Sequence, residues 1–150
     1  MKALLTAIKT QLKTSLTYVR DSDIFVSEDE RMISDAVKFP AVGLKDGTIT
    51  YTRATKSQED QELQVKIIAY QELRKPEASI MGHTSIGEEP IITHKGVLEI
   101  IADIITSLKN NLLSGEVHSA FPIAESESEL LADEETAIIM KSVTMQYFRY

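Results

Sequence analysis

The stretch KFPAVGLKDGTITYTRA constrains the fold more than any other part of the chain. Two β-prone runs, 39–45 and 48–54, meet there at Asp46 and Gly47. An Asp-Gly pair suits the positive φ angles of a tight two-residue turn, so the stretch predicts a β-hairpin that turns at this pair. Pro40 lacks an N–H donor and therefore fits the start or the edge of its strand.

Alternating apolar and polar residues predict further strands. Residues 63–70 alternate in this way after the polar link TKSQEDQ, which predicts a third strand and an antiparallel meander. Shorter β-prone runs occupy 24–27 and 117–124. The run at 137–150 has apolar residues at both parities, so we expect a terminal strand that is partly buried on both faces.

Two segments repeat apolar residues at spacings of three and four, the pattern of an amphipathic helix. The first predicts a helix over roughly 3–19. The second, at 97–112, has a broader apolar stripe, with Thr93 available near its N-cap and Gly115 just beyond its end. The chain therefore alternates between helical and strand patterns.

Residues 71–92 have no sustained period and contain two prolines and two glycines. They predict a loop of about twenty residues, and loops of that length in compact domains usually have a function or are disordered. We expect this loop to contact a partner.

Composition limits the classes of protein to which the chain can belong. At 150 residues it is about one domain long, with hydrophobic and charged fractions near globular averages, 43% and 26%. No apolar run is long enough to span a bilayer, and Lys9 and Lys13 interrupt the first one, so we expect synthesis in the cytoplasm and no membrane partner. The absence of cysteine excludes disulfides and thiolate chemistry. A net charge of −7 argues against general binding to phosphate backbones.

Six carboxylates with no basic residue among them crowd the segment ESESELLADEE at 125–135. Like charges at this density favour an extended, solvated segment, which predicts a surface loop between two strands. The acids are Glu125, Glu127, Glu129, Asp133, Glu134 and Glu135.

The sequence contains no recognisable catalytic or metal-binding motif. His83, His94 and His118 do not have the spacing that places two metal ligands on one helix face, and no nucleophile or phosphate-binding signature occurs. We therefore expect neither an enzyme nor a cofactor. Residues distant in sequence could still form a site, and the alternative is a pocket in which Tyr51, Tyr70 and His94 converge.

Taken in order, the predicted elements resemble the tail terminator (tail completion) proteins of long-tailed bacteriophages. The resemblance covers nearly the whole chain and is one of organisation rather than of an invariant motif. It is carried by the stretches FPAVGLKDGTITY, ELQVKIIAYQE, KGVLEIIADIITSLKNNLL, VHSAFPIAESES and AIIMKSVTMQYFRY.

The resemblance implies a small α+β subunit, with a mostly antiparallel sheet and two amphipathic helices packed on one face, that assembles as a hexameric ring. Such a ring caps the head-proximal end of the tail tube, ends tube polymerisation and joins the tail to the head. The implied partners are other copies of the chain, the tail tube protein and the head-tail connector protein, with genome DNA passing through. The implied location is the tail or neck of the virion.

A ring would multiply the acidic segment into about thirty-six carboxylates around one axis. Facing the lumen, they would repel DNA phosphates; facing along the axis, they could bind a basic partner surface. The family provides no motif-defined contact residues. Our own candidates for subunit or partner contacts are Asp46, Gly47, Arg53, Arg74 and Lys75.

Three other interpretations remain open at the level of sequence. Another phage neck subunit, such as a head-completion connector, would share the size, the ring and the lack of catalysis. A small enzyme or ligand-binding domain would instead have a deep polar pocket. An adaptor or chaperone would hold its partner with the loop at 71–92.

Overall fold

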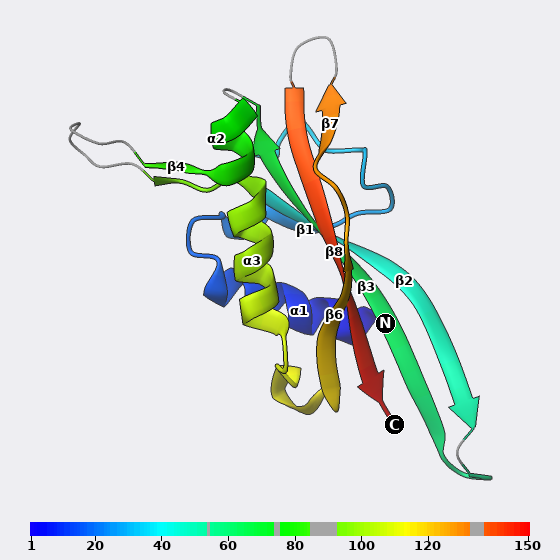
Figure 1. Cartoon of the computed structure of the whole chain (residues 1–150). Helices are drawn as coiled ribbons and strands as arrows, with labels where there is room; N and C mark the ends of the chain where they lie inside the picture. The colour runs from blue at the N-terminus through cyan, green and yellow to red at the C-terminus, as the bar shows by residue number, and fades with distance from the viewer. Residues whose placement is uncertain (54, 74–75, 85–92, 133–136) are drawn as a thin grey trace.

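The computed structural model describes residues 1–53, 55–73, 76–84, 93–132 and 137–150. It has an α+β fold, with helices against a mostly antiparallel six-stranded sheet (Figure 1). The strand order is β1-β2-β3-β8-β6, and β7 also pairs with β8. The elements are α1 (Lys2–Ser15), β1 (Ile24–Val26), β2 (Ala41–Arg53), β3 (Glu59–Glu72), α2 (Pro76–Met81), β4 (His83–Thr84), β5 (Thr93–His94), α3 (Val97–Leu108), β6 (Ser119–Glu125), β7 (Glu129–Ala132) and β8 (Ala137–Arg149), with 3₁₀ turns η1 (Asp21–Asp23) and η2 (Leu113–Gly115).

The predicted hairpin turn at Asp46 and Gly47 is wrong. Both residues lie inside β2, a single strand, and the chain reverses only after Arg53. The register advances three residues on β2, from Asp46 to Ile49, but only two on β3, which places a bulge here. The predicted three-stranded meander is therefore a single hairpin of two long strands, β2 and β3; below, the β2–β3 ribbon means this hairpin. An Asp-Gly pair suits a bulge as well as a turn, and the long pairing of β2 with β3 decides between them.

Glycine is required at the bulge because the partner strand passes close to it. A Cβ on Gly47 would lie 2.6 Å from the backbone oxygen of Gln64. A backbone atom held in the middle of a long strand cannot easily move away. The sequence was therefore correct that this position needs glycine, but the reason is a close approach between strands.

The main core lies between one face of the sheet and the helices α1 and α3, which confirms the predicted packing of two helices on one face of the sheet. Alternate residues of β3, such as Val65 and Ile67, face it, together with Val143 and Met145 of β8. α1 ends at Ser15, four residues earlier than predicted, yet the core continues past it. The buried apolar residues of the helices and the segment after α1 are Leu4, Ile8, Leu12, Leu16, Val19, Ile100, Ile101, Ile104 and Leu108.

The boundaries of α3 differ from the prediction at both ends. Its N-cap is Gly96 rather than Thr93, and it ends at Leu108 rather than at 112. Asn110, with φ 59°, lies in the left-handed region and stops the helix from continuing. The helix itself has the predicted apolar stripe facing the sheet.

The opposite face of the sheet has a smaller core beneath the segment at 28–40. Ile68 and Tyr70 of β3 pack there with Met140 of β8, and the partly buried Val37 and Phe39 lie against them. The phenol of Tyr70 donates a hydrogen bond to the backbone oxygen of Glu30 at 2.6 Å, which fastens the segment to the sheet. This second core explains why β8 is buried on both faces, as predicted.

The prediction of a structureless loop at 71–92 is wrong for its described part. This part contains the end of β3, then α2 and β4, which pairs with β5. The hydroxyl of Ser79 donates to the backbone oxygen of Glu72 at 2.9 Å and so holds α2 against the end of β3. Residues 85–92 lie outside the described part. Among the helices of the described residues, none is long and apolar enough to cross a membrane.

Asp23 provides a test of how η1 is held. Its side chain is 1% exposed, and it accepts hydrogen bonds from Arg20 Nε at 2.6 Å, from Arg20 Nη2 at 3.0 Å and from the backbone N–H of Lys38 at 3.1 Å. The bond from Arg20 lowers the pKa of Asp23 below its usual value. Asp23→Ala should lower the free energy of unfolding by about 1–2 kcal/mol, because it removes the charged acceptor of the Lys38 N–H and of Arg20, whose side chain is 51% exposed and remains solvated.

The pH dependence follows from the sign of that shift. A lowered folded-state pKa stabilises the fold above the unfolded-state value of about 4, and the stabilisation is lost as pH falls through the folded-state value. Urea titrations from pH 3 to 7 should therefore show the difference between wild type and Asp23→Ala shrinking at low pH. Asp21→Ala is the control, because Asp21 is exposed. A difference that does not change with pH would contradict the ion-pair account.

Candidate functional site

The outer half of the β2–β3 ribbon extends beyond the helices (Figure 1). Residues 46–53 of β2 are exposed except for the half-buried Ile49, and Tyr51 is 57% exposed. β1 pairs only with residues 42–44, so no described strand pairs with the outer edge of β2 beyond Leu44. The ribbon thus offers side chains on both faces and backbone donors and acceptors along one edge.

The other edge of the sheet is less suited to pairing with another strand. β6 pairs only with β8, and its register shifts between Pro122 and Ala124. Proline has no N–H to donate, and bulges on edge strands hinder further pairing. Of the two edges, β2 is therefore the better template for strand addition.

The candidate contact residues have different environments. Asp46 and Gly47 lie at the bulge, where the exposed part of β2 begins. Arg53 lies at the end of β2, and its guanidinium donates to the backbone oxygens of Thr55 and Lys56 at 3.3 and 3.2 Å. It closes the hairpin turn, a role that sequence analysis missed. Arg74 and Lys75 fall outside the described residues.

The acidic segment is only partly the loop that sequence predicted. Glu125 ends β6, and Glu129 begins β7, which pairs with β8 from Glu129↔Met140 to Ala132↔Ala137. Ser126 fixes the link between them, because its N–H donates to the Ser142 backbone oxygen and its hydroxyl accepts from the Ser142 N–H, both at 2.9 Å. The segment is therefore held against the sheet.

The described acids differ in their partners. Glu125 lies 3.6 Å from the Lys141 ammonium, and Glu129 lies 3.4 Å from the Arg31 guanidinium. Glu127 is exposed and has no ion pair among the described residues. Neighbouring cations thus offset part of the predicted negative charge. The remaining acids, Asp133, Glu134 and Glu135, lie outside the described part.

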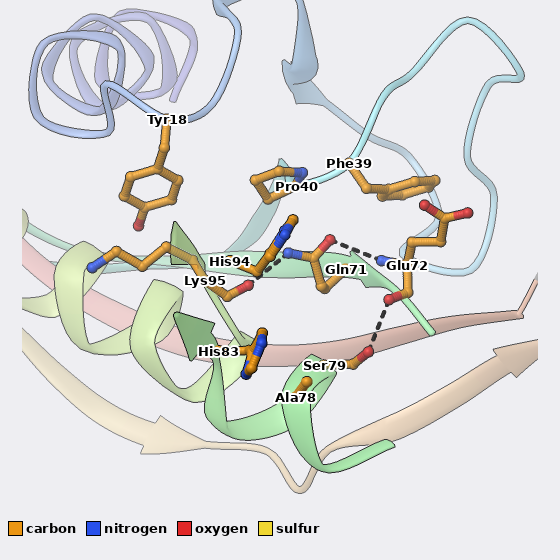
Figure 2. A pocket seen from close by; sticks show the side chains of 10 residues that line it. All are labelled: Tyr18, Phe39, Pro40, Gln71, Glu72, Ala78, Ser79, His83, His94 and Lys95. Atoms are coloured by element: carbon orange, nitrogen blue, oxygen red, sulfur yellow. Dashed lines mark hydrogen bonds between the residues drawn. The ribbon is translucent and has the colours of Figure 1, made fainter. Parts of the chain in front are cut away.

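A pocket of about 370 Å³ opens where α2, the β4–β5 pair and the end of β3 meet the segments around residues 18 and 39 (Figure 2). Apolar surface comes from Phe39, Pro40 and Ala78, and polar groups come from the remaining residues. Its lining comprises Tyr18, Phe39, Pro40, Gln71, Glu72, Ala78, Ser79, His83, His94 and Lys95.

Contacts with α3 determine the charge on one wall of this pocket. The Lys95 ammonium lies 3.3 Å from Asp103 Oδ2 and 3.9 Å from Glu99 Oε2, and 5.3 Å above the ring of Tyr18. The Tyr18 hydroxyl donates to the same Asp103 oxygen at 2.7 Å. Burial, reinforced by this hydrogen bond, raises the pKa of the Tyr18 phenol far above its usual value, so it remains a neutral donor. The wall therefore combines one ammonium with two carboxylates and carries a net negative charge.

One of the remaining polar side chains, Gln71, is hydrogen-bonded to backbone groups. Gln71 Nε2 donates to the backbone oxygen of Lys95 at 2.6 Å, and Gln71 Oε1 accepts from the N–H of Glu72 at 3.0 Å. His83 and His94 are cross-strand partners in the β4–β5 ladder, and both imidazoles are exposed to the pocket (Figure 2). The pocket can thus accept a small, partly apolar molecule with imidazole donors or acceptors beside it.

The predicted convergence of Tyr51, Tyr70 and His94 is wrong. Only His94 lines the pocket; Tyr51 projects from the ribbon, and Tyr70 is buried in the smaller core on the opposite face. Sequence analysis did not identify Tyr18 or Lys95, for which the only local signal was the four-residue spacing of Lys95 and Glu99. Within the described ranges, no three His, Cys, Asp or Glu side chains gather as a metal site.

No protein-family model matches the chain, and no curated protein is significantly similar to it.

The bulge in β2 can be tested directly, because Gly47 is a candidate contact residue whose structural role is now defined. Gly47→Ala should lower the free energy of unfolding by roughly 1–3 kcal/mol, since the added Cβ would clash with the backbone of Gln64. Thr48→Ala, at an exposed neighbour, should change it by less than about 0.5 kcal/mol. Chemical denaturation measures both. An unchanged Gly47→Ala protein would mean that the strands do not approach as described.

Proposed function

We propose that the chain is a tail terminator subunit, which assembles as a hexameric ring on the head-proximal end of a phage tail tube. The observation that carries the proposal is the outer half of β2, whose residues 46–53 are exposed except for the half-buried Ile49 and whose outer edge has no described strand partner beyond Leu44. The α+β fold agrees with what the resemblance implies, and the ribbon supplies the surface that an assembling subunit needs.

The ribbon is long enough to reach a neighbouring protein. Eight residues of β2, from 46 to 53, span about 26 Å at roughly 3.3 Å per residue. An isolated two-stranded ribbon is marginally stable in water, whereas here β3 also pairs with β8 as far as Gln61, so the outer half of β2 is supported by the sheet. Its edge groups can pair with a strand of another subunit, and its side chains can pack against that subunit.

In this role the chain performs no covalent chemistry and needs no cofactor. One face of the ring would meet the tail tube protein and stop its polymerisation, and the other would meet the head-tail connector protein. The acidic segment would lie toward the lumen, where it repels passing DNA, or toward a basic partner surface. Another phage neck subunit would share these properties. The choice of the tail terminator family therefore rests on the sequence resemblance, and the proposal of assembly rests on the exposed ribbon.

The mass of the purified protein in solution tests the ring. Light scattering over a concentration series at two salt concentrations should detect a species of about 100 kDa, six times the 16.8 kDa chain. A protein that stays monomeric under every condition would contradict the proposal.

A variant pair tests the role of the ribbon. Tyr51→Asp, which places a charge on the exposed ribbon, should weaken hexamer formation by roughly tenfold or more while leaving the melting temperature nearly unchanged. Met32→Asp is the matched control, because Met32 is 72% exposed and lies in the segment at 28–40. Equal assembly of the two variants would remove the ribbon from the interface.

The pocket supports a second candidate, a small ligand-binding domain. Its volume of about 370 Å³ lies within the usual range for ligand sites, and its lining combines apolar and polar groups. If this candidate is correct, a fragment screen by NMR should perturb the resonances of His83 and His94 in a monomeric protein. Fragments that perturb neither histidine would count against it.

A further inference from the structure

α1 carries three lysines along an open groove beside the β1–β2 edge of the sheet. The groove has a volume of about 590 Å³, and α1 covers this edge of the sheet. Positions 2, 9 and 13 lie on one face of a helix, because they are two and three turns apart. The residues on which the argument depends are Lys2, Lys9, Lys13, Leu5, Val26 and Asp46.

The lysines of this groove have no ion pair within the described part of the chain. Among the described residues, Asp46 is the one acid on the groove wall, so three lysines face one carboxylate. Leu5 is half-buried and Val26 is 53% exposed, which adds apolar surface beneath the lysines. The groove thus combines positive charge with apolar contact area, in a chain whose net charge is −7.

A surface with the opposite charge lies at the other edge of the same sheet. β1 is the outermost strand on one side, whereas β6 and β7 lie on the other, beyond β8. Glu127 lies exposed between β6 and β7, and the Glu125 and Glu129 side chains are 45% and 51% exposed despite their neighbouring cations. Ile123 and Leu130, 44% and 51% exposed, place apolar surface beside these acids.

We propose that the acidic segment at 125–129 of one copy docks in the lysine groove of the next copy. The inference rests on the proposed ring and specifies the contact that builds it. A contact between two different surfaces of the same chain is heterologous, and its repetition closes a ring when the rotation between neighbouring copies is a whole fraction of a turn. Glu127 has no ion pair among the described residues, and the exposed pair of Glu129 with Arg31 contributes little, so Glu129 can exchange its partner at small cost; Glu125 stays paired with the largely buried Lys141.

A second copy fits the groove better than a nucleic acid. The charge to be matched is small, three lysines beside one aspartate, and the whole chain would repel a polyanion. The acids at 125–129 offer a similar number of opposite charges, and both surfaces have exposed aliphatic side chains beside the charges. Both surfaces occur on every copy, so each subunit supplies one contact and receives another.

Charge reversal tests the contact. Lys9→Glu with Lys13→Glu should weaken assembly by roughly tenfold or more, and Glu127→Lys with Glu129→Lys should do the same. Mixing the two variants should restore the large species, because each reversed groove then meets a reversed segment and each native groove meets a native one. The quadruple variant should assemble alone. Light scattering measures mass, and circular dichroism checks that each variant is folded.

The matched control is Lys38→Glu with Lys109→Glu, which changes the net charge equally at two exposed lysines outside the groove. It should assemble like wild type. If wild type forms rings and the reversed variants form them equally well, the docking contact is overturned and the ring is retained. If wild type never assembles, both the ring and the contact fail.

Binding of duplex DNA tests whether the groove binds a nucleic acid and not a second copy of the chain. Binding of a fluorescent duplex to wild type, lost in Lys9→Glu with Lys13→Glu while the mass in solution is unchanged, would identify the groove as a nucleic-acid surface and overturn docking between copies. No binding to the duplex, together with rescue by mixing, is the result that we expect.

Discussion

The pairing of β3 with β8 is the constraint on which the rest of the structure depends. The two strands are in register from Gln61↔Arg149 to Glu72↔Ile138, and both lie inside the sheet, since β2 continues it on one side and β6 and β7 on the other. One face of the pair is covered by α1 and α3, and the other by the segment at 28–40. A slip of one residue would exchange the two faces and expose both cores, so this register determines where every other element packs.

Local periodicity was sufficient to predict the fold class but not the path of the chain. The apolar stripes of α1 and α3 and the two buried parities of β8 are properties of short windows, and the structure has all of them. The reversal was misplaced because Asp46 and Gly47 suit two backbone arrangements equally well. Only the long-range pairing with β3 separates them. α2 was missed for a different reason: six residues are too few to establish a helical period.

The candidate sites were less predictable than the fold because they depend on strand order. The described residues that line the pocket come from six separate stretches of the chain, and Lys95 matters there only because Tyr18 and Asp103 lie against it. In sequence, the lysines of α1 are simply the polar face of an amphipathic helix. They become candidates for a contact between copies because the topology places the acids at 125–129 at the opposite edge of the same sheet. The acids were easy to recognise in the sequence, whereas the pairing of β7 with β8, which holds them to the sheet, was not.

The bulge in β2 also sets which face each outer side chain occupies. Before it, Val42 and Leu44 point toward the helices; after it, the parity changes, so that Ile49 and Tyr51 lie on that face because they pair with Leu63 and Gln61. Loss of Gly47 or Thr48 would remove the bulge but leave Ile49 opposite Leu63, so the outer side chains would keep their faces and only the local twist of β2 would change. The bulge can therefore accommodate the gain or loss of one codon in β2 without changing the surface that the outer strand presents or the core beneath its inner half.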